Sequence, residues 1–219
     1  MIPAWFDVGV LTVVTVLLGI WVVRRVVRLV RPRGTVGFAV GALVVATVSF
    51  FTALGFEVRH QIAQERATAV VRELTGNPSA HAACQRFTPD LLDLSNYAGS
   101  VRWESPHVAL LRRATCNDLH SWLVSRKTEP NLDQVIALHV VVHEAVHVAG
   151  ERSESVTECT ALQYDARAAE LLGATPEQAQ ALAVRYYEEA YPMLRPEYRS
   201  RGCVEDGPLD LSPGDGRFP

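Results

Sequence analysis

Acidic residues are nearly absent from the first quarter of this 219-residue sequence, where Asp7 is the only acid before Glu57. Residues 1–56 carry five arginines and a net charge of +4, whereas residues 57–219 carry a net charge of −7. An acidic domain lacks the basic surface that binds phosphate backbones, so we expect no nucleic-acid partner. With 48% hydrophobic and 21% charged residues, the chain also falls outside the collagen-like, low-complexity and fully disordered classes.

Charged side chains are missing from two long apolar runs, residues 2–23 and 35–56, apart from Asp7. At 1.5 Å per residue, a helix over either run matches the hydrocarbon core of a bilayer, which is about 30 Å thick. A cleaved signal peptide would have a shorter apolar stretch after a basic segment, and here the basic segment follows the first run. We therefore expect residues 1–56 to form a membrane anchor of two transmembrane helices in the lipid bilayer.

The loop between the runs, residues 24–33, contains no acid and five arginines: Arg24, Arg25, Arg28, Arg31 and Arg33. The positive-inside rule places such a loop in the cytoplasm. We therefore expect a two-pass protein of the cell membrane, with its N-terminus and its large C-terminal part on the extracytoplasmic side.

Cysteine is absent from the predicted anchor, and the rest of the chain contains four: Cys84, Cys116, Cys159 and Cys203. An even number of cysteines in an exterior domain predicts disulfide bonds. Pairing neighbours in sequence order gives Cys84 with Cys116 and Cys159 with Cys203. No Cys-x-x-Cys motif is present, which disfavours a zinc site built from thiolates.

Composition divides the exterior part into a helical stalk over 57–78, a domain over 79–204, and a flexible tail over 205–219 that is rich in Pro, Gly and Asp. Extended runs at 99–103 and 107–111 predict a small β-hairpin in the domain. The fold class is thus mainly α, with two transmembrane helices and a helical exterior domain.

Helix signals recur along this domain. Asn131 with Gln134, and Thr175 with Gln178, form capping boxes, and Gly150 and Gly173 are typical of helix ends. These signals predict helices over 114–124, 131–149, 153–172 and from Thr175 to about Pro192.

The segment His143-Glu144-Ala145-Val146-His147 is an H-E-x-x-H motif. On a helix, residues four apart share one face, so both imidazoles can bind one zinc ion, whereas on a strand they would lie about 13 Å apart. The many valines favour a strand, but the run from 131 to 150 is too long for one. Glu144 would face the open side of the metal, where a carboxylate can deprotonate water.

No histidine follows His147, so a third zinc ligand must be a carboxylate. Glu151, Glu154 and Glu158 are the candidates. If the two helices are antiparallel about a turn near Arg152, Glu158 is level with Ala145, between the histidines, and this register favours Glu158. We interpret His139 as a packed or supporting histidine, and Asp165 as a carboxylate that could orient a ligand.

These residues resemble the zincin metallopeptidases, and within them the glutamate zincins, over about 30 residues. The resemblance implies that His143, His147 and Glu158 bind Zn²⁺ and that Glu144 is the general base. The pattern Glu154-x-x-x-Glu158 is also similar to that group's Glu-x-x-x-Asp, which would instead make Glu154 the ligand and Glu158 its support. This chain departs from the family in its short spacer after His147.

The chain also has no downstream histidine to stabilise an oxyanion, a role for which Tyr164, Tyr186, Tyr187 and Arg152 are candidates. We expect a membrane-anchored zinc-dependent peptidase that hydrolyses a peptide or protein substrate, held in extended form by a strand of the hairpin. The alternatives are a non-catalytic zinc-binding membrane protein for partner recognition or scaffolding, and a membrane scaffold without metal.

Overall fold

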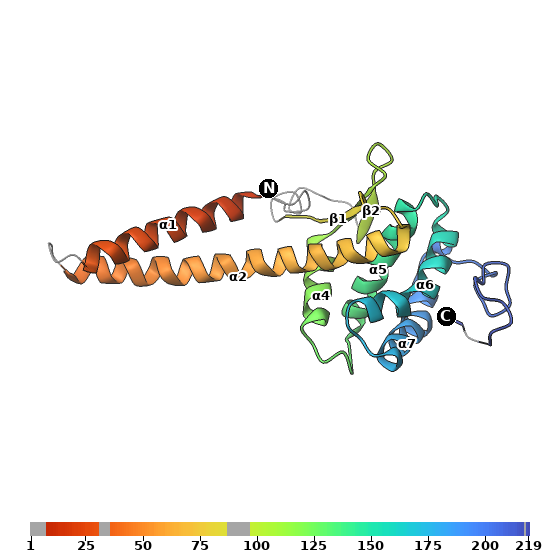
Figure 1. Cartoon of the computed structure of the whole chain (residues 1–219). Helices are drawn as coiled ribbons and strands as arrows, with labels where there is room; N and C mark the ends of the chain where they lie inside the picture. The colour runs from red at the N-terminus through yellow and green to blue at the C-terminus, as the bar shows by residue number, and fades with distance from the viewer. Residues whose placement is uncertain (1–7, 31–35, 87–96, 217) are drawn as a thin grey trace. The chain divides into compact units, whose positions relative to one another are not determined.

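The computed structural model describes residues 8–30, 36–86, 97–216 and 218–219. It divides into two compact units, Met1–Gln61 and Ile62–Pro219, and Figure 1 shows the elements of both. Residues 2–7 of the first predicted membrane run, and Arg31, Arg33 and Thr35, lie outside the described residues.

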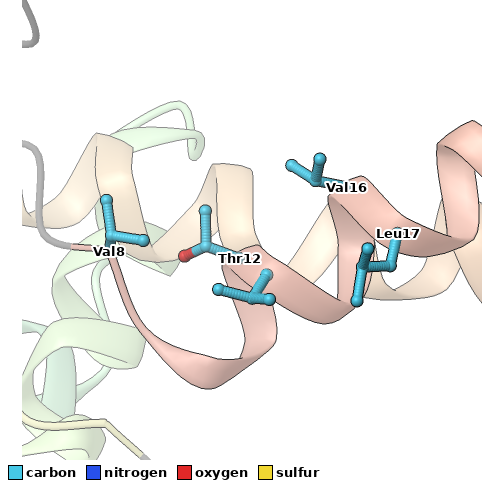
Figure 2. Close-up of a pocket in the computed structure, with 5 residues that line it drawn as sticks. Val8, Thr12, Val16 and Leu17 are labelled. Carbon is cyan, nitrogen blue, oxygen red and sulfur yellow. The ribbon is translucent and has the colours of Figure 1, made fainter.

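The first unit contains helix α1 (Val10–Val30) and the first part of helix α2 (Val36–Thr75). Both helices are long and apolar enough to cross a membrane: the mean hydropathy of an 18-residue window reaches 2.1 within Val10–Arg28 and 1.8 within Val40–Thr75. Their apolar side chains are largely exposed. Figure 2 shows four residues, Val8, Thr12, Val16 and Leu17, that line a shallow hollow along α1.

Among the described residues of this unit, a hydrogen bond from Thr12 and a close approach at Gly19 join α1 to α2. The Thr12 hydroxyl donates a hydrogen bond of 2.9 Å to Glu57 Oε1, and Gln61 Nε2 donates one of 2.8 Å to the same oxygen. At Gly19 the helices approach closely, because a Cβ there would lie 2.9 Å from the ring of Phe50. The buried Glu57 carboxylate is therefore held by polar groups from both helices.

The second part of α2 contributes to the core of the second unit. Ala63, Ala67, Val70 and Val71 are at most 1% exposed, and Gly76, with φ +62°, follows the end of the helix. The segment predicted as a helical stalk, 57–78, is thus helical to Thr75 and buries part of its surface. Small and β-branched residues at helical spacing pack one face of this segment into the domain.

A small mixed sheet lies beside the helices. Strands β2 (Gly99–Val101) and β3 (Val108–Leu111) pair antiparallel, as the hairpin prediction expected. The structure adds β1 (His81–Cys84), which pairs parallel to β3, and the strand order is β1-β3-β2. Strand β2 therefore pairs along only one of its edges in the described sheet.

Four helices form the bulk of the second unit: α4 (Arg113–Leu123), α5 (Leu132–Val148), α6 (Glu154–Leu171) and α7 (Pro176–Arg185). Both predicted capping boxes are present, at Asn131 and at Thr175. Helix α5 is central, with most of its residues buried, and it contacts α4, α6 and both β2 and β3. After α7 come a π-helical turn, Tyr186–Ala190, and two 3₁₀ turns, Tyr191–Met193 and Pro196–Tyr198.

Both predicted disulfides are confirmed. Cys84 bonds to Cys116 and joins β1 to α4, and Cys159 bonds to Cys203 and joins α6 to the C-terminal segment. All four residues are buried.

The C-terminal segment, predicted as a flexible tail over 205–219, contacts α6 and the turn after α7. Gln163 Nε2 donates to the Leu209 carbonyl at 2.9 Å, and the Leu211 amide donates to Gln163 Oε1 at 2.7 Å. Near the end, the ring of Phe218 packs edge-on against Tyr187. Gln163 of α6 thus forms hydrogen bonds with the backbone of this segment. The composition of the segment alone does not predict such a long-range contact.

Candidate metal centre

His143 and His147 lie one turn apart on α5 and their side chains meet. Both are buried, each with a relative exposure of 7%, and their Nε2 atoms are 3.1 Å apart. This is the geometry that the i, i+4 spacing predicts for a helix.

Glu154, the first residue of α6, completes a group of three. Its Oε2 lies 3.2 Å from His143 Nε2 and 3.3 Å from His147 Nε2. In a tetrahedral zinc site with bonds of about 2.0–2.1 Å, neighbouring ligand atoms are about 3.3 Å apart. The spacing of these three atoms, and their two-nitrogen, one-carboxylate composition, therefore fit a zinc ion.

The second nitrogen of each histidine is engaged elsewhere. His143 Nδ1 donates to Glu158 Oε2 at 2.9 Å, and His147 Nδ1 donates to the Glu151 carbonyl at 2.8 Å. With their Nδ1 protons held in this way, both rings present a lone pair at Nε2 to the same point when they are neutral. Such partners are typical of metal-ligating histidines.

Glu158 is not in this group, in contrast to the expected ligand set of His143, His147 and Glu158. Its carboxylate lies on the Nδ1 side of His143, away from His147, and also 3.1 Å from His139 Nε2. The Tyr186 hydroxyl donates to its other oxygen at 2.8 Å. The structure instead brings together the alternative trio, with Glu154 in the third position and Glu158 in support.

The connection between α5 and α6 explains the difference. Helix α5 ends in a Schellman motif: Glu151 N–H donates to the Val146 carbonyl and Gly150 N–H to the His147 carbonyl, with Gly150 at φ +112°. The chain therefore turns tightly and α6 begins at once with Glu154. Glu158 consequently lies against His143 and His139 instead of between His143 and His147, about one helical turn from the position that we expected.

Behind His143 and His147 lies a second, fully buried cluster. His139 Nδ1 donates to Asp165 Oδ2 at 2.8 Å, with exposures of 1% and 0%, and the His139 ring stacks on Tyr186 with centroids 3.7 Å apart. Burial alone would lower the pKa of His139, but the Asp165 and Glu158 carboxylates outweigh it and raise this pKa to about 10. His139 is therefore an imidazolium held between two carboxylates at neutral pH.

His139, His143 and Glu158 also lie close enough together to hold a metal ion. Of the two groups, only the trio with Glu154 has all its members at a pocket, because neither His139 nor Glu158 lines it. The pocket has a volume of about 240 Å³ and is lined by Tyr97, Gly99, Ser100, Val101, Trp103, His143, Glu144, His147, Arg152, Glu154 and Tyr198. Hydrogen bonds with His143 and His147 hold the pKa of Glu154 down at about 2, so this carboxylate is ionised.

Glu144 lines the pocket, and one of its carboxylate oxygens accepts no hydrogen bond from a described residue. It is 4% exposed, and its Oε2 has no hydrogen-bond partner among the described residues. Burial raises the pKa of Glu144 to about 7, although His143 and His147 oppose the increase. A Cβ at Gly99 of β2 would lie 2.6 Å from Glu144 Oε1, so only glycine leaves room for this carboxylate.

The pocket walls include residues that sequence reasoning missed. Of the four candidates for an oxyanion donor, only Arg152 lines the pocket, and Tyr186 is engaged with Glu158. Tyr198 also lines it, with its ring 5.9 Å from that of His143. Tyr198 lies on a 3₁₀ turn far along the chain from the H-E-x-x-H motif, and no local signal marks it.

Zinc affinity is expected to increase with pH. Burial lowers the pKa of His143, but hydrogen bonds to Glu154 and Glu158 outweigh it and raise this pKa to about 9 in the metal-free protein. His143 therefore carries a proton on Nε2 at pH 7, which a zinc ion must displace. Below pH 9, the apparent affinity should rise about tenfold per pH unit for each proton released. Calorimetry in buffers of different protonation enthalpy counts these protons, and a count of zero would contradict this arrangement.

Comparison of the chain with protein-family models, with curated proteins and with solved structures found no match.

Proposed function

We propose that this protein is a membrane-anchored, zinc-dependent peptidase of zincin-like type. The observation that carries the proposal is the convergence of His143 Nε2, His147 Nε2 and Glu154 Oε2, 3.1–3.3 Å from one another, at a pocket that also holds Glu144. The buried Glu/His groups could hold a metal ion, and zinc is the ion that this donor set favours.

When bound, zinc supplies Lewis-acid polarisation of the substrate carbonyl and a lower pKa for attacking water. With zinc bound, Glu144 would take a proton from water at Oε2, which has no partner among the described residues, and would deliver it to the leaving nitrogen. The pKa of Glu144 is about 7 in the metal-free protein, and a zinc ion nearby would lower it and keep the carboxylate ionised as a base. The Tyr198 hydroxyl is the proposed donor to the oxyanion, because Tyr198 lies beside His143 in the pocket wall.

The position of strand β2 favours a peptide as the substrate. Its residues Gly99, Ser100 and Val101 line the pocket, and β2 is an edge strand in the order β1-β3-β2. An extended peptide could add to that edge through backbone hydrogen bonds, the mode in which sheet edges recognise peptides. The peptide carbonyl would then lie near the three metal ligands.

The membrane location is part of the same proposal. Helices α1 and α2 are apolar over spans of sufficient length, and Val10, Val45 and Phe51 are each more than 60% exposed. A bilayer would cover these side chains. Arg24, Arg25 and Arg28 lie in the last part of α1, and the positive-inside rule favours the cytoplasmic side for that end of the helix. The two disulfides of the second unit agree with an oxidising exterior.

The test is a Glu144→Gln variant of the full chain, purified in detergent and loaded with zinc. The variant should bind one zinc per molecule as the wild type does, but hydrolyse a library of quenched fluorescent peptides about 10²–10⁴-fold more slowly, the usual contribution of a general base. Glu170→Gln, at an exposed position of α6, is the matched control and should keep full activity.

Two results would overturn the proposal. Zinc-loaded wild type that cleaves no library member would leave a non-catalytic zinc-binding protein. A wild type that binds no zinc would exclude both the zinc-dependent peptidase and the non-catalytic zinc-binding protein.

A further inference from the structure

Arg152 and Trp103 form one wall of the pocket. The Arg152 guanidinium carbon lies 4.5 Å from the centroid of the Trp103 ring. The same indole lies against His147, with ring centroids 6.2 Å apart and planes nearly perpendicular. Trp103 thus contacts both a cation and one of the histidines that could hold zinc.

The arginine of this wall differs from three others in the same unit. Arg167, Arg185 and Arg195 each form a salt bridge with a glutamate, whereas no carboxylate of a described residue forms one with Arg152. It is also the only Lys or Arg among the described residues that line the pocket. A lone, unpaired cation therefore lies at the mouth of a pocket in a domain that is acidic overall.

The Arg152 guanidinium carbon lies over the Trp103 ring, and no described residue accepts a hydrogen bond from this side chain. A guanidinium that lies over an aromatic ring uses its face for the cation–π contact. Its N–H groups lie in the plane of the group and remain free to donate, and two of them match the two oxygens of a carboxylate. Trp103 therefore orients Arg152 for a planar anion without consuming its donors.

We propose that Arg152 binds a carboxylate of the substrate, so that the pocket selects peptides with a negatively charged group close to the bond at the metal. This inference rests on the proposed peptidase function, which it makes more specific. A carboxylate can come from an Asp or Glu side chain, or from the C-terminus of the peptide. The two sources share the same chemistry at Arg152 and differ in which peptides are bound.

The experiment measures binding instead of hydrolysis. Zinc-loaded full-length Glu144→Gln is titrated by calorimetry with eight-residue peptides of neutral sequence. One set is amidated at the C-terminus and carries a single Glu, or Gln in its place, at each position in turn. A further peptide has no acidic side chain but a free C-terminal carboxylate.

An ion-paired hydrogen bond of this kind should make the best carboxylate peptide bind about 10–100-fold more tightly than its neutral counterpart. A second substitution, Arg152→Gln, should abolish that difference and leave the affinity for the neutral peptide unchanged. Arg167→Gln, which removes the same charge at a site paired with Glu73, should preserve the difference. Because Arg152 is exposed, its substitution should not change the melting temperature.

Equal loss of affinity for charged and neutral peptides in Arg152→Gln would overturn the inference, since it would show a packing role on Trp103. Equal binding of both classes without that substitution would overturn it too. Failure of the peptidase proposal looks different: the carboxylate preference would persist in a wild type that hydrolyses nothing. Hydrolysis without any carboxylate preference would reject the role of Arg152 alone.

Discussion

Glu154→Ala is expected to empty the metal centre, whereas Glu158→Gln should weaken it and leave it assembled. Glu154 Oε2 is the only carboxylate oxygen of a described residue within 3.3 Å of both His143 Nε2 and His147 Nε2. Its loss leaves two ligands of the three that a catalytic zinc needs. Glu158 acts through His143 Nδ1, and loss of such a supporting partner costs about 10–100-fold in metal affinity. Glu154→Ala should exceed that range.

The measurement is bound zinc per folded molecule, together with competition against a chelator of known affinity. Glu170→Ala is the control, because it removes an exposed acid from the same helix. Folding is checked by circular dichroism, since stability alone does not distinguish a ligand from a residue of the first helical turn. Full zinc occupancy in Glu154→Ala, with an empty site in Glu158→Gln, would contradict this prediction. It would show that Glu158, the ligand expected from the helix register, binds the metal.

Asp165→Ala is expected to lower the free energy of unfolding by about 3–5 kcal/mol, the usual cost of removing one partner from a buried ion pair. Asp165 and His139 are almost fully buried and joined at 2.8 Å. When Asp165 is removed, Glu158 is the carboxylate that stays paired with the His139 imidazolium. Asp165→Asn retains an oxygen that can accept from His139 Nδ1, so its cost should be smaller.

The pH dependence of this cost identifies its origin. The pKa of His139 is raised to about 10, above the value of 6.5 for the unfolded chain. Its ion pairs therefore stabilise the fold fully below pH 6.5, and this stability is lost as the pH rises through 10. Denaturant unfolding of the metal-free full chain should show a cost for Asp165→Ala that shrinks between pH 7 and pH 10. The exposed Asp133 of the first turn of α5 gives a control: Asp133→Ala should cost only about 0.3–1 kcal/mol. If the loss of unfolding free energy in Asp165→Ala did not change with pH, Asp165 would act through packing and not through its ion pair with His139.

The features that could be predicted from the sequence are those with local causes. Asn131 and Thr175 begin helices because their side chains accept the backbone N–H of the third helical residue. Gly150 ends α5 because it adopts a positive φ that other residues avoid. The histidines at 143 and 147 meet because helical spacing alone brings them together.

The features that could not be predicted depend on pairings across the chain. Strand β1 is four residues long and forms only beside β3. The choice between Glu154 and Glu158 depends on where α6 begins relative to α5, which the tight turn after α5 sets and no helix pattern encodes. Tyr198 reaches the pocket only because the chain folds back after α7.

The π-helical turn at Tyr186–Ala190 lies between α7 and the segment that carries Tyr198. Tyr186, at its start, belongs to the buried cluster around Glu158, and Tyr198, after it, belongs to the pocket wall. Each residue of a regular helix turns the chain by about 100°, so a single deletion in this turn would rotate everything beyond it relative to α7. The spacing between these two tyrosines therefore depends on the number of residues in the turn more than on their identity. Relatives of this protein should tolerate substitutions at the exposed Glu188 and Glu189 of the turn more readily than insertions or deletions.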